Sequence, residues 1–196
     1  MKERNLSVVV YCASSREIDK LYFESAYRLG QLLVKNNITC INGAGKQGLM
    51  GELNDSILKH GGKVKGVIPK FMVESGWCHD NLTETIVTET IHERKRQMAQ
   101  LSDAAFALPG GVGTLEELSE IITLKQLGLY NNPVIILNIN NYYDPLLIFL
   151  EKMIEESFMS SVYRNLIQVA SSPEEAIDLF QNRSVQTPII SKYTNQ

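Results

Sequence analysis

The chain has 196 residues, of which 44% are hydrophobic and 21% charged, a composition typical of one globular domain and not of a disordered chain. Nineteen lysines and arginines stand against 22 acidic residues, which gives a formal net charge of −3. This balance argues against a general nucleic-acid-binding protein, which usually carries a basic footprint, but it allows a small anionic ligand held by a few local cations.

Strands and helices are predicted to alternate along the chain. The first apolar run, Leu6–Cys12, is rich in valine, as parallel strands buried on both faces usually are. Further strands are predicted at 38–42, 64–68, 85–88, 104–108, 134–137 and 167–170, and helices at 18–36, 49–60, 90–101, 114–129, 143–157 and 173–181. Residues 70–82 lack a clear period and are expected to form a loop or a short helix. The alternation predicts an α/β fold with a parallel sheet.

This pattern covers one domain, residues 1–181, and the polar residues 182–196 are expected to form a C-terminal tail. Right-handed crossovers bring the loops that follow parallel strands together at the carboxyl edge of the sheet. Ligands bind at that edge in open α/β sheets, so we expect the site in the loops that follow the strands.

The cysteines favour a reducing compartment. Cys12, Cys40 and Cys78 are odd in number and far apart, with no C-x-x-C pair and no zinc-ligand spacing. We therefore expect three buried, reduced thiols in a cytoplasmic protein. Leu6–Cys12 is too short for a signal-peptide core, and no stretch reaches the roughly 18 apolar residues of a membrane span, so no membrane partner is expected.

A glycine-rich loop follows the second predicted strand. Residues 43–48 (GAGKQG) match the G-x-G-x-x-G pattern. Binding of NAD needs an acidic residue about 20 positions further on, and residues 67–70 (VIPK) contain none. The pattern favours a turn in which Gly43 and Gly45 let the backbone approach a phosphate or sugar. Glycines needed only for tight turning and packing are the alternative.

A second glycine-rich loop, Pro109–Thr114, joins the strand at 104–108 to a helix. The free N–H groups and the positive dipole end of that helix make an anion site suited to a phosphate, and Thr114 is expected to cap the helix. The loop is not a Walker A motif, because no Gly-Lys-Ser/Thr follows at the required spacing.

Charged residues lie beside this loop. Glu116 and Glu117 are expected in the first helical turn, where acids stabilise a helix by about 0.3–1 kcal/mol, so simple dipole complementarity is one interpretation. The preceding helix carries His92–Arg96 (HERKR), which alone would indicate a solvated charged face. Because both segments follow strands that end on one edge, an arginine here can clamp a phosphate or orient a carboxylate.

These residues resemble the Lonely Guy family of nucleoside 5′-monophosphate phosphoribohydrolases. The family motif P-G-G-x-G-T-x-x-E is met in full by Pro109–Glu117, and its Arg-Lys pair after a histidine is met by His92–Lys95. Residues 11–15, 48–51, 66–69, 126–128 and 142–146 are similar to other landmarks of the family. The similarity extends over about residues 6–180.

The resemblance implies a Rossmann-like three-layer sandwich with a central parallel sheet, usually as a homodimer. It also implies hydrolysis of the N-glycosidic bond of a nucleoside 5′-monophosphate, either AMP or an N6-substituted cytokinin-type AMP, to a free base and ribose 5-phosphate. Arg94 and Glu117 would be the catalytic pair. The nucleotide would bind to Gly110, Gly111, Gly113, Thr114 and Glu116, with Lys95 adding local positive charge.

Three segments differ from the usual family sequence: Ala13, Gly43–Lys46 and Ile91. These differences concern the pocket expected to hold the base more than the residues expected to carry out the reaction. Members have often been labelled lysine decarboxylases, a reaction that needs pyridoxal phosphate and a Schiff-base lysine, for which the sequence gives no specific support. We therefore expect no cofactor and no metal.

Cleavage of an N-glycoside passes through a transition state with positive charge on the sugar. A carboxylate such as Glu117 can stabilise that charge and activate the attacking water. Two other functions are compatible with the sequence. One is a carrier of the same fold that binds a nucleotide or cofactor without hydrolysis, and the other is a structural module whose glycine loops only pack. The loop Phe71–His79, which contains Trp77, is a candidate to line a pocket or to lie at the dimer interface, with simple packing of Trp77 as the favoured interpretation.

Overall fold

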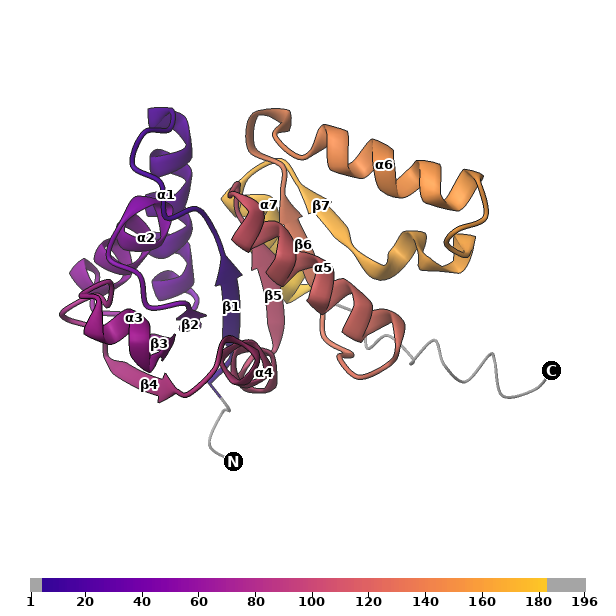
Figure 1. The fold of residues 1–196 in the computed structure, drawn as a ribbon. Coiled ribbons are helices and arrows are strands. Elements are labelled where there is room, and N and C mark those ends of the chain that lie inside the picture. Colours follow the sequence, from indigo (N-terminus) through magenta and orange to yellow (C-terminus); the bar gives the residue numbers. More distant parts are fainter. Residues whose placement is uncertain (1–4, 183–196) are drawn as a thin grey trace.

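The predicted alternation of strands and helices is confirmed by the computed structural model, which describes residues 5–182 (Figure 1). The predicted tail therefore lies outside the described residues, apart from residue 182. The strands are β1 (Ser7–Tyr11), β2 (Thr39–Asn42), β3 (Val64–Pro69), β4 (Glu84–Thr88), β5 (Ala104–Ala107), β6 (Val134–Leu137) and β7 (Gln168–Ala170). The helices are α1 (Lys20–Lys35), α2 (Gly48–Lys59), α3 (Lys70–Glu74), α4 (Ile91–Leu101), α5 (Val112–Gln126), α6 (Asp144–Glu155) and α7 (Pro173–Gln181), with short 3₁₀ helices η1 (Ile139–Asn141) and η2 (Ser161–Leu166).

The seven strands form one parallel sheet in the order β4-β3-β2-β1-β5-β6-β7. The central strand β1 pairs with β2 on one side and with β5 on the other, so that Val8 lies between Cys40 and Ala104. The chain runs outward from β1 to β4 and then returns through α4 to the other side of β1. Strand order therefore reverses between β1 and β5, and such a switch point is where open α/β sheets bind ligands.

Helices cover both faces of the sheet, which confirms the three-layer α/β sandwich. Successive residues of β1 point to opposite faces, as in any strand. Val8 and Val10 pack with the cluster that includes buried residues of α1, α2 and α7, while Val9 and Tyr11 pack with buried residues of α4 and α5. The residues of β2, β5 and β6 are buried throughout, which explains why β5 and β6 are apolar without alternation.

Helix α5 begins at Val112, two residues before the predicted start. Its N-cap is Gly111, with an extended backbone and no capping side chain, so the expectation that Thr114 caps the helix is wrong. Glycine is accepted at N-caps, and the sequence offered no reason to prefer it over a threonine. The earlier start places Glu116 and Glu117 beyond the first turn, which contains no acidic residue. The interpretation of these acids as partners of the helix dipole is therefore also wrong.

The segment after β3 folds as predicted into a short helix, α3, and a loop. Cys12 and Cys40 are buried as expected, but Cys78 in this loop is only partly buried. Cys78 forms an isolated antiparallel bridge with Gly45, outside the seven strands. All three thiols are free. Among residues 5–182, no helix combines the length and the apolar character needed to cross a membrane.

Candidate active site

A cavity of about 540 Å³ opens at the carboxyl edge of the sheet, at the switch point between β1 and β5. Its volume lies within the range of about 300–1,000 Å³ common for small-molecule sites. Loops after β1, β2, β3 and β5 contribute to it, together with α4 and the start of α5. The lining residues are Cys12, Ala13, Ser14, Gly43, Gly45, Lys46, Gln47, Met50, Ile68, Met72, Trp77, Arg94, Gly111, Val112, Gly113, Thr114 and Glu117.

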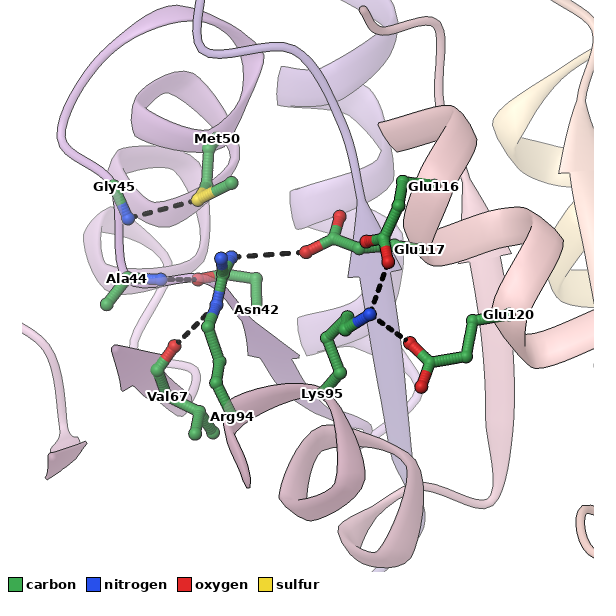
Figure 2. A network of polar contacts seen from close by, with 10 residues as sticks. All are labelled: Asn42, Ala44, Gly45, Met50, Val67, Arg94, Lys95, Glu116, Glu117 and Glu120. Atoms are coloured by element: carbon green, nitrogen blue, oxygen red, sulfur yellow. Dashed lines mark hydrogen bonds and ion pairs between the residues drawn. The ribbon is translucent and has the colours of Figure 1, made fainter. Parts of the chain in front are cut away.

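Arg94 of α4 and Glu117 of α5 meet across this cavity (Figure 2). Arg94 Nη2 lies 3.2 Å from Glu117 Oε1, and the two side chains are only 12% and 10% exposed. Both residues were predicted to form the catalytic pair. The structure brings together two residues that are more than twenty positions apart in the chain.

The first glycine loop makes room for the guanidinium of Arg94. A Cβ atom on Gly43 would lie 1.9 Å from Arg94 Nη2, so any larger residue would displace it. Arg94 Nε donates a hydrogen bond of 3.1 Å to the carbonyl oxygen of Val67 at the end of β3. Two neighbouring strand ends therefore fix the direction in which Arg94 approaches Glu117.

Glu117 is poised to exchange a proton near neutral pH. Burial raises the pKa of its carboxyl to about 7, against the lowering effect of Arg94, while the charge of Glu116 adds to the rise. Carboxyl groups with pKa values near the working pH are typical of acid–base catalysts. The environment of Glu117 is therefore that of a reactive group.

The second glycine loop is held by its carbonyl groups. Tyr143 Oη donates to the carbonyl of Leu108 (2.8 Å), and Tyr142 Oη donates to that of Gly110 (2.7 Å). The carbonyl of Pro109 accepts from the N–H of Ala13 (3.1 Å). Since these carbonyls are engaged by the protein, the loop is fixed where it leads into α5. The first N–H groups of a helix have no acceptor within the helix, so they remain available to a ligand at this point.

Gly110 and Thr114 are packed against each other. A Cβ on Gly110 would lie 2.1 Å from Thr114 Oγ1, so glycine is required here. Thr114, Gly111 and Gly113 line the cavity, whereas Gly110 lies behind them and does not. Gly110 was predicted to bind the ligand, but it packs against Thr114 and does not itself line the cavity.

Lys95 and Glu116 lie away from the cavity. Lys95 Nζ bonds to Glu116 Oε1 and lies 2.6 Å from Glu120 Oε2, and its side chain is only 8% exposed (Figure 2). Burial opposes the charge of Lys95, but hydrogen bonds to the two glutamates outweigh this effect and raise its pKa. The two predicted binding residues therefore pair with each other, and neither lines the cavity.

The first glycine loop is fixed by a buried amide pair. Asn42 donates to Asn54 (2.6 Å) and accepts from the N–H of Ala44 (2.9 Å), while the N–H of Gly45 contacts Met50 Sδ (3.0 Å). Gly43 and Gly45 line the cavity as predicted for binding residues. Lys46 also lines it and, within residues 5–182, forms no ion pair, so it is a cation available to an anionic ligand.

Sequence reasoning missed the roles of several residues. The sequence identifies Tyr142 and Tyr143 only as landmarks of the family, whereas in the structure their hydroxyls hold the second glycine loop. Simple packing was the favoured interpretation of Trp77, but the residue lines the cavity, which was the alternative for its loop, and is 53% exposed. Within residues 5–182, no three histidine, cysteine, aspartate or glutamate side chains gather as a metal site.

Fold and site together define a Rossmann-like α/β protein with a glycine-rich loop at a helix N-terminus beside a buried Arg–Glu pair. Residues 50–180 match the model of a protein family described as "Possible lysine decarboxylase". Two relatives from Arabidopsis thaliana, cytokinin riboside 5′-monophosphate phosphoribohydrolases LOG1 and LOG2, are 41% and 38% identical to the chain. The LOG1 match covers 87% of this chain and 80% of the relative, and the LOG2 match covers 92% and 84%. The chain belongs to this family, the Lonely Guy family.

A solved structure shows the same fold. The molybdenum cofactor binding protein from Rippkaea orientalis superposes with a TM-score of 0.70 over 91% of this chain and 97% of that protein. Its sequence is 23% identical, so the likeness concerns the architecture alone.

Proposed function

We propose that this protein hydrolyses the N-glycosidic bond of a nucleoside 5′-monophosphate, releasing a free base and ribose 5-phosphate. The observation that carries the proposal is the buried Arg94–Glu117 pair, which lies in a nucleotide-sized cavity beside the N-terminus of α5. Relatives of similar length that are named phosphoribohydrolases support the same reaction.

Glu117 is the group that acts on the sugar. As a carboxylate it stabilises the positive charge that develops on the ribose and orients the attacking water. The water oxygen bonds to C1′ while the C1′–N bond breaks, and the electron pair of that bond stays on the leaving base. One hydrogen of the water stays in the new ribose hydroxyl. The other passes as a proton to Glu117 and from there, directly or through solvent, to the leaving base, which returns Glu117 to the carboxylate. The raised pKa of Glu117 allows it to receive a proton from water during this step.

Arg94 positions Glu117 and keeps part of it ionised. Its guanidinium lies 3.2 Å from the carboxylate and lowers the pKa that burial alone would give. Because Val67 holds the Nε atom, the guanidinium presents a fixed edge toward the ribose or the leaving base.

The 5′-phosphate is proposed to bind at the N-terminus of α5. Gly111, Gly113 and Thr114 line this end of the cavity, and Lys46 supplies a cation to the cavity lining from the first glycine loop. Binding energy from the phosphate would hold C1′ in reach of Glu117, which is how remote contacts contribute to catalysis. The substrate base is adenine or an N6-substituted adenine, as the names of the relatives suggest.

The decisive experiment is to incubate the protein separately with AMP and with N6-isopentenyl AMP and to measure free base by chromatography. We expect base release from at least one nucleotide and little from the matching nucleoside, which lacks the phosphate. Stoichiometric binding without base release would instead establish a carrier. A protein that neither binds nor cleaves any nucleoside monophosphate would contradict both functions.

The protein is further proposed to be a cytoplasmic homodimer. Three free cysteines favour a reducing compartment. Helix α6 has no buried residue, and its Ile148 and Phe149 are 69% and 54% exposed, which suits a surface that a second copy covers. Light scattering of the full chain tests this: a monomeric mass across the working concentration range would contradict it.

A further inference from the structure

One wall of the cavity has no part in the mechanism proposed above. Met50, Ile68, Met72 and Trp77 line it from α2, the end of β3 and the segment around α3. The phosphate end of the cavity is formed instead by the start of α5. Figure 1 shows α3 on the β3 side of β1 and α5 on the β5 side. The four apolar residues therefore lie on the β3 side of the cavity, its apolar end, whereas the glycine-rich start of α5 lines the other side.

The backbone of Trp77 is firmly held. Its N–H donates to the carbonyl of Met72 (3.1 Å), and its carbonyl accepts from the N–H of Lys46 (3.1 Å) in the first glycine loop. The next residue, Cys78, bridges to Gly45. Trp77 is thus tied to the glycine loop that borders the cavity, so the position from which its side chain projects is fixed.

The side chain of Trp77 is free although its backbone is held. The residue is 53% exposed, and within residues 5–182 the indole stacks on no other aromatic ring. Tryptophan is usually well buried because its large apolar surface is costly to leave in water. An indole that lines a cavity and lacks a partner offers a flat apolar face to a flat ligand.

We propose that Trp77 stacks on the base of the nucleotide and so selects for large, flat bases at the apolar end of the cavity. The inference rests on the proposed function, which places the phosphate at α5 and C1′ at Glu117. The base of such a nucleotide extends away from α5, toward Ile68 and Met72. Stacking of a base on an aromatic side chain is worth about 1–3 kcal/mol, or roughly 5- to 150-fold in binding.

Trp77 is the only tryptophan of the chain, so intrinsic indole fluorescence reports on this residue alone. The protein carrying Glu117→Gln is titrated with AMP and, separately, with ribose 5-phosphate, which has the same phosphate and sugar but no base. We expect AMP to quench the fluorescence and ribose 5-phosphate to leave it nearly unchanged, with calorimetry confirming that both ligands bind. Binding of AMP without quenching would overturn the proposal, as would equal quenching by the two ligands.

Variants provide a second readout. Trp77→Ala should raise KM for AMP by about tenfold, within the range expected for loss of one stacking contact, while kcat changes little. Trp77→Phe, which keeps a flat ring, should restore most of the affinity. Phe71→Ala is the matched control, since Phe71 is a 47% exposed aromatic residue of α3 that does not line the cavity. Equal KM values for Trp77→Ala and the parent protein would contradict the proposal.

The fluorescence titration separates this inference from the proposed hydrolysis. Quenching by AMP in a protein that releases no base would support Trp77 and refute the reaction. Base release by the parent protein, with no quenching in the bound Glu117→Gln variant, would support the reaction and refute the role of Trp77.

Discussion

Two groups of ionic contacts join α4 to α5, and they differ although they use adjacent residues. Arg94 meets a single acid, Glu117, within the cavity, and both side chains are nearly buried. Lys95 meets two acids, Glu116 and Glu120, whose side chains are 52% and 37% exposed. The first group contains a carboxyl with a raised pKa, whereas the second surrounds one cation with two solvated carboxylates.

The difference follows from helix geometry. Successive residues of an α-helix point about 100° apart, so residues that are adjacent in sequence do not share a face. Arg94 and Glu117 face the cavity, while Lys95, Glu116 and Glu120 form a bridge beside it. One turn separates Glu116 from Glu120, and this places both carboxylates within reach of one ammonium group. Adjacent charged residues thus divide into a buried pair in the cavity, proposed to be reactive, and a brace between the two helices.

Removal of the Glu117 carboxylate should have the largest effect. Glu117→Gln keeps the shape of the side chain but cannot accept a proton, so we expect kcat for base release to fall by about 10²–10⁴-fold. Glu120→Gln is the matched control on the same helix and should change kcat by less than about threefold, since a surface ion pair contributes little. Comparable losses of kcat in the two variants, measured at saturating AMP, would contradict the distinction between Glu117 as a reacting group and Glu120 as a partner of Lys95.

Displacement of Arg94 should have the next largest effect. Gly43→Ala places a Cβ atom where Arg94 Nη2 now lies, so the guanidinium must move away from Glu117. Misplacement of a catalytic group by about 1 Å can cost roughly 10²-fold in rate, and we expect a loss of that order in kcat/KM. In the Glu117→Gln background the same substitution should add little, because the two residues act as a unit. Additive losses in the double variant would contradict the coupling.

Part of this arrangement was accessible from the sequence. Periodicity identified all seven strands and placed Pro173–Gln181 at its observed bounds, because buried parallel strands are uniformly apolar and proline marks a helix start. The family motifs brought Arg94 and Glu117 together. The sequence also implied that the side chains of Arg94 and Lys95 lie on different faces of α4, since adjacent helical residues cannot point the same way.

Other features depend on tertiary contacts that a local pattern does not specify. The start of α5 at Val112 depends on carbonyl groups held by Tyr142, Tyr143 and Ala13, which come from two other loops. The exposure of Trp77 depends on the attachment of its loop to the first glycine loop. Burial of Glu117 raises its pKa, and burial is a property of the folded cavity and not of the motif.

The pH dependence of catalysis should report the raised pKa of Glu117, with kcat/KM changing by about tenfold per pH unit below that pKa. Since Glu117 acts as a carboxylate with a pKa of about 7, kcat/KM for AMP should rise with pH and level off above that value. Arg94 lowers this pKa, so Arg94→Gln should move the rising limb to higher pH. A limb that stays in place in this variant would contradict the electrostatic role assigned to Arg94.

The stability of the folded protein should fall as pH rises toward the pKa of Glu117, whereas kcat/KM should rise. The carboxyl of Glu117 has a folded-state pKa of about 7 against an ordinary value of 4.5, so the folded state binds more protons between these values. The free energy of unfolding contributed by this group therefore decreases as pH rises from about 4.5 to about 7. Denaturant unfolding of Glu117→Gln should lack that decrease. The same slope in both proteins would assign the pH dependence to other groups.

Loss of Lys95 should have the smallest effect on catalysis and a measurable effect on stability. Lys95→Met removes a nearly buried ammonium group and leaves Glu116 and Glu120 to repel each other across one turn. Breaking a fully buried ion pair costs about 3–5 kcal/mol, but these glutamates are partly solvated, so we expect a loss of about 1–2 kcal/mol. Lys65→Met, which removes an exposed pair with Glu84, is the control and should cost under about 1 kcal/mol. Because Lys95 braces α4 against α5 without entering the cavity, kcat should fall by less than about tenfold; a loss as large as that of Glu117→Gln would place Lys95 in the reactive group after all.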